Sequence, residues 1–233
     1  MVIGLCVPNA FKCGVKKPGT RIVGGVPTQV NEYPWMVRLQ LTINGQTEPL
    51  GCGATLVAQE WAITATHCMG GLKASDLAAL LGEDDTETTS ETTLTKSFPV
   101  SKIINHPNFQ DVSNDITLLK LSSKVDLNKY TPVCLPAPDT SWVGKTAWVY
   151  GWGATSFGGF SSNKLLEVPV VVVNLDTCRS PGGVYQDVEI GMVCAGGVKG
   201  EDSCQVRTKM VSQVLHIDGE CTTLFVNDGG VLK

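Results

Sequence analysis

A histidine next to a cysteine carries the first recognisable chemistry in this sequence. His67 follows the apolar run at residues 61–65 and is directly followed by Cys68, while Cys52 stands sixteen residues before Cys68. A disulfide between the two cysteines would hold the histidine rigidly at a strand end, which suits a general base because proton transfer tolerates little misplacement. A histidine beside a cysteine also occurs as a purely structural pair, so His67 alone leaves both interpretations open.

Asp115 is the acidic residue that such a base would need. It follows Asn114 and opens the apolar run at residues 116–121, so its carboxylate would lie at the edge of a core and would need a partner there. An imidazole is one such partner, because a carboxylate holds the ring in one tautomer and stabilises the ring once it is protonated. The alternative is an aspartate that begins a strand in an ordinary turn.

Short apolar runs separated by turn residues dominate the chain around these two residues. They are residues 35–41, 54–57, 61–65, 116–121, 147–152 and 168–173. With 25 glycines and 12 prolines in 233 residues, this pattern predicts an all-β fold of the sandwich or barrel kind. The proline-rich residues 131–142 are the expected connector between two lobes.

The cysteines indicate the compartment. The chain has nine cysteines, three histidines and no Cys-x-x-Cys pair, which favours disulfides over zinc and therefore an oxidising, extracellular location for a secreted protein. The odd number implies at least one thiol without a partner inside the chain. The apolar residues 1–7 are too short for a secretion signal, so we expect the amino terminus to be incomplete.

Charge and hydropathy exclude two classes of partner. The net charge is −4 with both signs dispersed, which argues against nucleic acid, and no apolar run approaches the length that spans a membrane. No metal site is expected. The acidic residues 83–87 are interpreted as a solvated loop, although a calcium loop would also need clustered carboxylates.

Seven motifs, in order along the chain, carry a resemblance to a known family. They are Arg21-Ile22-Val23-Gly24-Gly25, Glu32-Tyr33-Pro34-Trp35, Thr64-Ala65-Thr66-His67-Cys68, Asn114-Asp115-Ile116-Thr117-Leu118-Leu119, Gly151-Trp152-Gly153, Val193-Cys194-Ala195-Gly196-Gly197 and Asp202-Ser203-Cys204-Gln205. Together they resemble the trypsin-like serine proteases of the chymotrypsin family, peptidase S1. The resemblance implies a pair of β-barrels.

The resemblance also implies a role for each matching residue. Cleavage after Arg21 by an activating protease would make Ile22 a new amino terminus, as in a zymogen. His67 would be the general base and Asp115 the carboxylate that orients it, in the mechanism known for this family. Asp202 would lie at the floor of the specificity pocket and favour Arg or Lys before the scissile bond.

Three disulfides are implied in the same way. Two of them join Cys52 to Cys68 and Cys178 to Cys194. The third would tether the leader through Cys13 and Cys134. No cofactor is expected from the family.

The sequence departs from the family immediately after Gln205. The family has Gly-Asp-Ser-Gly-Gly-Pro there, and this chain has Val-Arg-Thr-Lys-Met-Val. Val206 is poorly suited to the backbone geometry of an oxyanion hole, and Arg207 would place a like charge against the ammonium group of Ile22. Thr208 stands in the register of the serine, and we do not expect it to act as a nucleophile without those two features.

These observations lead to one predicted architecture and two functions. We expect a leader at residues 1–21, a partial trypsin-like domain at residues 22–205 and a non-family tail at residues 206–233, with the second barrel incomplete. We interpret the sudden change as a truncation caused by a retained intron or an error in gene assembly.

The function expected by family is peptide-bond hydrolysis after Arg or Lys, with this chain inactive. The alternative is a secreted, non-catalytic homologue that binds a protein partner, a substrate or a protease inhibitor.

Overall fold

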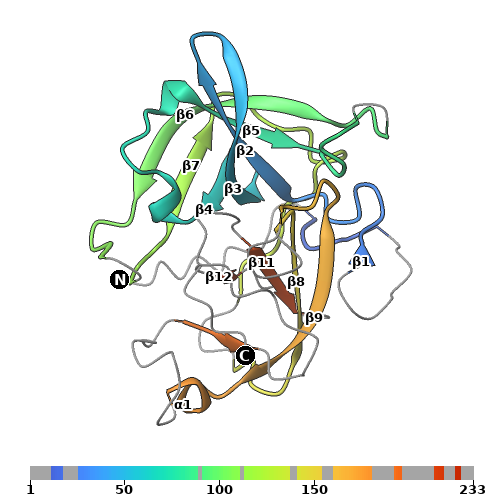
Figure 1. Ribbon diagram of the computed structural model, residues 1–233, viewed down its shortest axis with the longest axis vertical. Coiled ribbons are helices and arrows are strands. Elements are labelled where there is room, and N and C mark those ends of the chain that lie inside the picture. Colours follow the sequence, from blue (N-terminus) through green and yellow to red (C-terminus); the bar gives the residue numbers. More distant parts are fainter. Residues whose placement is uncertain are drawn as a thin grey trace.

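The computed structural model describes residues 12–17, 26–88, 91–110, 113–136, 141–153, 160–179, 192–195, 213–217 and 224–226. Within these ranges the chain forms two lobes made of strands, drawn one above the other in Figure 1. The prediction of an all-β fold is confirmed. No helix in the ranges given is both long and apolar enough to cross a membrane.

The first lobe is a closed barrel of six antiparallel strands in the order β2-β3-β4-β7-β6-β5. The strands are β2 (Met36–Ile43), β3 (Gln46–Ala58), β4 (Trp61–Thr64), β5 (Leu77–Leu81), β6 (Lys96–Asn105) and β7 (Thr117–Leu121). Asn44 and Gly45 connect β2 to β3 with φ angles of 53° and 79°. Positive φ at both positions gives a turn whose twist matches that of the strands it joins. Closure leaves this barrel with no strand edge exposed.

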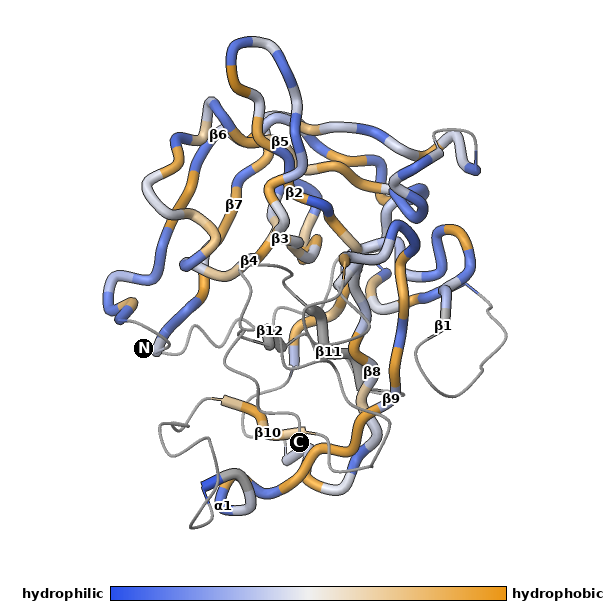
Figure 2. The backbone as a smooth tube through the Cα atoms, in the orientation of Figure 1, coloured by the Kyte–Doolittle hydropathy of each residue, from blue (hydrophilic) through white to orange (hydrophobic). Residues whose placement is uncertain are grey.

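Alternating burial along the strands fills the barrel with aliphatic side chains. In β7, Thr117, Leu119 and Leu121 point inward while the residues between them are partly exposed. All five residues of β5 are buried. Hydrophobic residues accordingly follow the strands of both lobes in Figure 2, and β9 (Leu166–Val173) is apolar over most of its length. The barrel interior belongs to a buried core that also includes Trp148 and Tyr150 from the second lobe.

The second lobe is an open sheet among the residues that the structure describes. Its order is β1-β9-β8-β11-β12, and β10 also pairs with β9. The further strands are β1 (Val26–Pro27), β8 (Thr146–Gly151), β10 (Cys194–Ala195), β11 (Gln213–Ile217) and β12 (Leu224–Val226). An incomplete second barrel was expected, and the described part of the lobe agrees with that expectation.

The tail contributes to this sheet, which the sequence had not indicated. Strand β11 pairs antiparallel with β8 from Val214 opposite Tyr150 to Ile217 opposite Ala147, and β12 pairs with the other side of β11. A bare edge on β8 would leave a row of N–H and C=O groups without partners, and the tail supplies them.

An aromatic cluster joins the two lobes. The Trp35 indole donates to the Tyr150 hydroxyl at 2.6 Å, and the ring of Tyr33 stacks on that of Tyr150 with centroids 4.0 Å apart. The Tyr33 hydroxyl donates to the buried carboxylate of Glu167 on β9. Burial, assisted by the Glu167 carboxylate, raises the pKa of Tyr33 far above its ordinary value. These contacts connect the segment just before β2 with β8 and β9 in one shared core.

Residues 12–17 of the leader lie against the body of the protein. Cys13 forms a disulfide with Cys134, Gly14 N donates to Pro132 O at 2.8 Å, and Lys17 N donates to Glu32 O at 3.0 Å. The Lys16 ammonium lies 3.3 Å from Glu32 Oε1 and over the rings of Tyr33 and Trp148, at 5.4 and 5.7 Å from their centroids. The segment is therefore held by one covalent bond and several polar contacts.

Candidate active site

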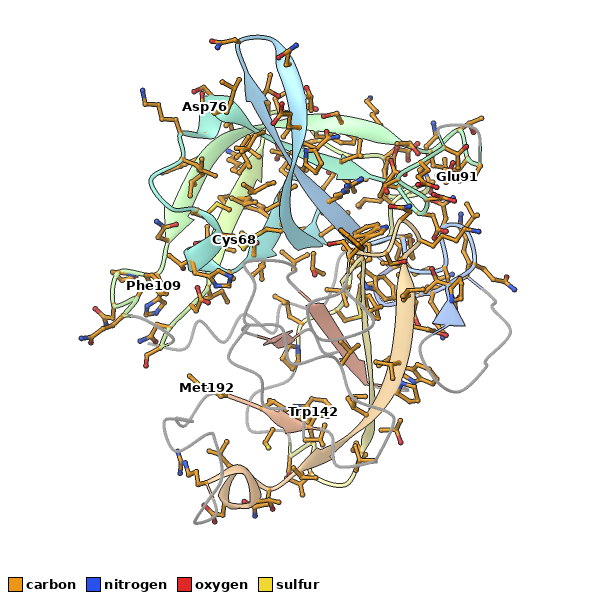
Figure 3. All side chains as sticks on the ribbon, viewed as in Figure 1. Cys68, Asp76, Glu91, Phe109, Trp142 and Met192 are labelled. Carbon is orange, nitrogen blue, oxygen red and sulfur yellow. A yellow bond between two sulfur atoms is a disulfide. The ribbon has the colours of Figure 1, made fainter. Side chains whose placement is uncertain are left out.

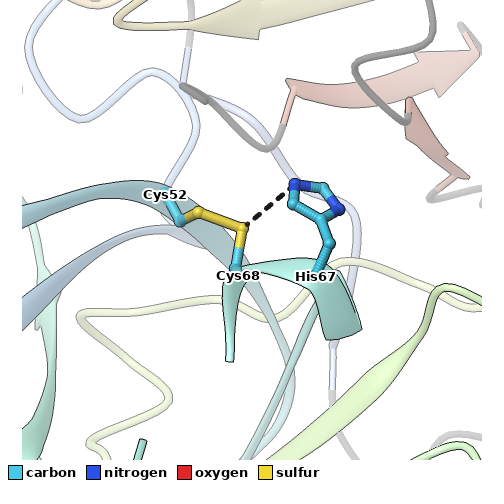
Figure 4. A group of neighbouring side chains, drawn as sticks. All are labelled: Cys52, His67 and Cys68. Atoms are coloured by element: carbon cyan, nitrogen blue, oxygen red, sulfur yellow. Dashed lines mark hydrogen bonds between the residues drawn. A yellow bond between two sulfur atoms is a disulfide. The ribbon is translucent and has the colours of Figure 1, made fainter. Parts of the chain in front are cut away.

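His67 lies on a short turn at the rim of the first barrel. The chain leaves β4 at Thr64 and forms the 3-10 turn η1 (Thr66–Cys68), which Met69 N closes by donating to Thr66 O at 2.9 Å. Cys68 is joined to Cys52 on β3 by a disulfide. Figure 4 shows that this bond lies directly beside the imidazole of His67. The turn is thus attached to two strands, which limits how far the imidazole can move.

Asp115 lies on the neighbouring loop, just before β7. Asn114 has a φ of 56°, a conformation that asparagine tolerates better than most residues, and its side-chain amide donates to Asn108 O at 3.0 Å. Ile116 N donates to Asn114 O at 2.8 Å, which tightens the turn around Asp115. This conformation directs the Asp115 carboxylate inward, where its side chain is only 5% exposed.

Two hydrogen bonds join His67 and Asp115. Asp115 Oδ2 lies 2.6 Å from His67 Nδ1, and Asp115 Oδ1 accepts from the backbone N–H of His67 at 2.8 Å. The His67 side chain is 32% exposed, so the imidazole is partly accessible to solvent. With the Nδ1 proton donated to Asp115, Nε2 is the basic nitrogen of the neutral ring. This arrangement can take a proton from a hydroxyl and stabilise the resulting imidazolium.

The neighbouring sulfur atoms do not turn this site into a metal centre. Ligand atoms of Cys52, His67 and Cys68 lie within 4.8 Å of one another. The two cysteines are bonded to each other, however, and a metal requires thiolates. Cys68 Sγ lies 3.5 Å from His67 Nε2, and the dashed line in Figure 4 marks that contact. The disulfide therefore serves to support the histidine turn.

The acidic residues 83–87 differ from the solvated loop that we had expected. Asp84 is buried and accepts from the Thr28 hydroxyl at 3.2 Å, whereas Glu87 is exposed. Burial raises the pKa of Asp84 to about 6, although the hydrogen bond from Thr28 opposes the rise. The prediction is therefore wrong for Asp84, because the loop folds back over β1 and the chain that precedes β9.

Glu83 adds a second perturbed carboxyl group to this loop. Burial, together with the carboxylate of Glu91, raises the pKa of Glu83 to about 7, and the Arg38 guanidinium opposes the rise. Figure 3 places Glu91 on the opposite side of the barrel from Cys68. The carboxyl cluster is therefore remote from the His67–Asp115 pair.

Several predicted site residues lie outside the described part of the chain. They are Arg21 and Ile22 at the expected cleavage point, Asp202 in the expected specificity pocket, and Thr208 in the serine register. Cys194 is disulfide-bonded, and the side chain of its expected partner Cys178 is likewise outside the described part. The structure brings together His67 with Asp115, Cys52 with Cys68, and Cys13 with Cys134.

A closed six-stranded barrel with a second β-lobe and a histidine–aspartate pair at its rim defines the serine-peptidase class of double-barrel protein. Comparison with known families agrees, since the family described as Trypsin matches residues 22–206. The chain belongs to the trypsin family. Enzymes of this family act through their own side chains and need no cofactor.

Three curated relatives from insects show the extent of the similarity. This chain is 32% identical to phenoloxidase-activating factor 3 of Holotrichia diomphalia over 216 residues, which cover 85% of this chain. It is 34% identical to the CLIP domain-containing serine protease HP8 of Bombyx mori over 229 residues, which also cover 85% of this chain. Venom serine protease 34 of Apis mellifera is 34% identical over 204 residues, covering 83% of this chain. The chain spans 61%, 58% and 48% of the lengths of these three relatives, respectively.

Proposed function

We propose that this chain is a trypsin-like serine endopeptidase by family, directed to Arg or Lys before the scissile bond, and that it does not hydrolyse peptide bonds as it stands. One observation carries the proposal. The His67–Asp115 pair is assembled with hydrogen bonds of 2.6 and 2.8 Å, while the sequence after Gln205 has no serine in the register where the family has its nucleophile. A general base without a nucleophile cannot complete acyl transfer.

Three substitutions at the same place support the inactivity. Val206 replaces the glycine whose backbone N–H would face the substrate oxyanion, and a β-branched residue resists that conformation. Arg207 replaces the aspartate that pairs with the new amino terminus of an activated protease. Thr208 has a hydroxyl, but it would act without an oxyanion hole. Losing one oxyanion donor alone costs roughly 100- to 1000-fold in rate.

Specificity for basic residues rests on Asp202. Its position in Asp202-Ser203-Cys204-Gln205 matches the family residue that lies at the floor of the pocket. A carboxylate there would bind the guanidinium of an Arg side chain in a bidentate manner. An inhibitor with an Arg at its contact position would use the same pocket. We therefore propose basic peptides, their inhibitors, and an upstream activating protease that cleaves after Arg21 as the partners of this chain.

The proposal is tested with an Arg-containing ester substrate. The full chain is cleaved after Arg21, and its hydrolysis rate is compared with that of the variant His67→Ala, treated in the same way. We expect equal, background rates for both proteins. Hydrolysis that exceeds the His67→Ala rate would overturn the proposed inactivity, since only a working base explains such a difference.

A second candidate function is binding without catalysis by a secreted homologue. The observation that favours it is the closed sheet of the first barrel with the paired His67 and Asp115 at its rim, all of which come from the chain before Gln205. The disulfides Cys13–Cys134 and Cys52–Cys68 suit an extracellular location. Capture of a specific protein from extracellular fluid by the wild-type chain, and by an Asp115→Ala control, would support binding independent of the pair. Capture of nothing would count against this function.

A further inference from the structure

Three polar side chains from three elements meet behind the His67–Asp115 pair. Thr66 belongs to η1, Thr117 is the first residue of β7, and Asn105 is the last residue of β6. The Thr117 hydroxyl donates to Asn105 Oδ1 at 2.8 Å, and its oxygen lies 3.0 Å from the hydroxyl oxygen of Thr66. Thr117 is the donor toward both acceptors, and because a hydroxyl carries a single proton, it donates to one of them at a time.

Burial makes this arrangement costly to disturb. Thr117 is 0% exposed and Thr66 is 5% exposed, so water does not readily replace either hydroxyl partner. A buried hydroxyl that loses its hydrogen-bond partner destabilises the folded protein, because no other partner replaces the lost one. The network therefore favours one arrangement of the two backbone segments over all others.

The network lies where the barrel ladder stops. Thr117 is opposite Thr64 in the β4–β7 pairing and opposite Asn105 in the β6–β7 pairing, and these are the last paired positions at this end of the strands. His67 and Asp115 both lie beyond that point, one residue after Thr66 and two residues before Thr117. One backbone bond, from His106 N to Ile116 O at 3.0 Å, continues from β6 to the residue after Asp115, whereas the β4–β7 pairing that links the His67 side to the Asp115 side ends at Thr64 opposite Thr117.

We propose that Thr117 is a positioning residue for the His67–Asp115 pair. Its hydroxyl, bonded between Thr66 and Asn105, holds η1 against the start of β7, so that the histidine ring and the aspartate carboxylate remain at hydrogen-bonding distance. This role goes beyond the proposed function, because it concerns the pair itself and holds whether or not the chain has a nucleophile.

The test uses the proton on His67 Nδ1 in the full-length chain. A proton in an N–H···O bond of 2.6 Å to a carboxylate is strongly deshielded, which separates its NMR signal from other protons. The chain has only three histidines, and the variant His67→Gln identifies the signal by removing it. The variant Thr117→Val keeps the shape of the side chain and removes its hydroxyl.

We expect Thr117→Val to move this signal toward lower chemical shift and to accelerate its exchange with water roughly two- to tenfold, the factor that follows from losing one ordinary hydrogen bond. Thr117→Ser should restore both properties, because it restores the hydroxyl. The matched control is Thr55→Val in β3. Thr55 is also 0% exposed, and its hydroxyl has no hydrogen-bond partner among the residues that the structure describes, so this variant should leave the His67 signal unchanged.

A purely structural role gives a different result. If Thr117→Val lowers the melting temperature but leaves the His67 Nδ1 signal and its exchange rate unchanged, the proposal is overturned. If Thr117→Val does not fold, Asn105→Ala replaces it, because Asn105 is exposed at the end of the network and tolerates truncation. An unchanged signal in that variant would overturn the proposal equally, and a shifted signal would support it.

Discussion

Asp115 accepts two hydrogen bonds from the same residue, one from the backbone N–H of His67 and one from its ring. The first bond fixes where the histidine turn begins, and the second fixes the orientation of its imidazole. A single carboxylate therefore determines both the position and the tautomer of the candidate base. Both residues of this pair belong to the first lobe and precede Gln205 in the chain.

Replacing Asp115 should disturb the first lobe as well as the imidazole. Asp115→Ala removes a nearly buried acceptor of two hydrogen bonds, and bonds to a charged group contribute about 1.5–3 kcal/mol each. We expect the free energy of unfolding to fall by at least the contribution of one such bond, as measured by urea denaturation. Glu48→Gln, which removes an exposed carboxylate from β3, is the control and should have little effect. Equal stability of the two variants would contradict this account.

The leader should contribute to stability through Lys16. The variant Lys16→Met keeps an aliphatic chain of similar length but removes the ammonium from Glu32. Glu32 is 3% exposed, and its carboxylate also accepts from the Gln29 N–H at 3.1 Å. We expect the free energy of unfolding to drop by about 1–3 kcal/mol. Thermal unfolding measures the change, and Lys17→Met, at an exposed position, serves as control.

A double variant separates pairing from packing. If the charge on Glu32 causes the loss, Glu32→Gln combined with Lys16→Met should be more stable than Lys16→Met alone, since no buried charge then lacks its cation. An additive loss in the double variant would show that Lys16 acts through its contacts with the rings of Tyr33 and Trp148 instead.

Glu83 should make stability depend on pH. Its pKa in the folded state is about 7, above the ordinary value of 4.5, so between these pH values the folded protein holds a proton that the unfolded chain has released. The contribution of this group to stability is therefore fully present below pH 4.5 and is lost as the pH rises through 7. Glu83→Gln stays neutral at every pH and removes this loss.

The expected result is a difference in melting temperature between variant and wild type that depends on the pH. The variant Glu83→Gln should melt higher than the wild type at pH 8, by roughly 2–4 °C for each kcal/mol gained, and near the wild-type value at pH 5. The measurement is made with a chelator present, so that no divalent cation binds the carboxylates. Asp84 titrates in the same direction in both proteins, and its effect cancels in the comparison. The exposed Glu87→Gln is the control, and a variant that is less stable than wild type at pH 8 would refute the prediction.

Strand β11 should protect the second lobe. Val214 is paired with Tyr150 of β8 and with Phe225 of β12, so Val214→Pro places a residue without an N–H in the middle of the sheet. We expect faster proteolysis of the chain after residue 141 and unchanged resistance of the first barrel. Val214→Thr keeps the N–H and the β-branched side chain and should behave as wild type. Equal cleavage rates for the two variants would show that the tail does not stabilise the sheet.

The features that the sequence predicted are those that local motifs specify. His67 and Asp115 lie in short segments that resemble the family, and each segment positions its own side chain through a turn next to a strand. The features that the sequence did not predict depend on distant contacts. Strand β11 pairs with β8, which lies more than sixty residues earlier in the chain, and the match to the family ends at residue 206, before β11 begins.

The sequence motifs also did not predict the polar contacts inside the protein. The buried position of Asp84 depends on Thr28, which lies 56 residues away, and the contact of Lys16 with Glu32 depends on how the leader crosses the surface. Thr66 and Thr117 carried a weak signal, since they flank His67 and Asp115 by one and two residues. Only the structure shows that their hydroxyls meet.

The most direct measurement of the central claim is covalent labelling. A fluorophosphonate reacts with a hydroxyl that an adjacent base and an oxyanion hole activate, so the full chain, cleaved after Arg21, is incubated with it and its intact mass is measured. An assembled His67–Asp115 pair without a nucleophile predicts no adduct, the same as for the His67→Ala variant. A single adduct that disappears in both His67→Ala and Thr208→Val would contradict the claim and identify Thr208 as a working nucleophile.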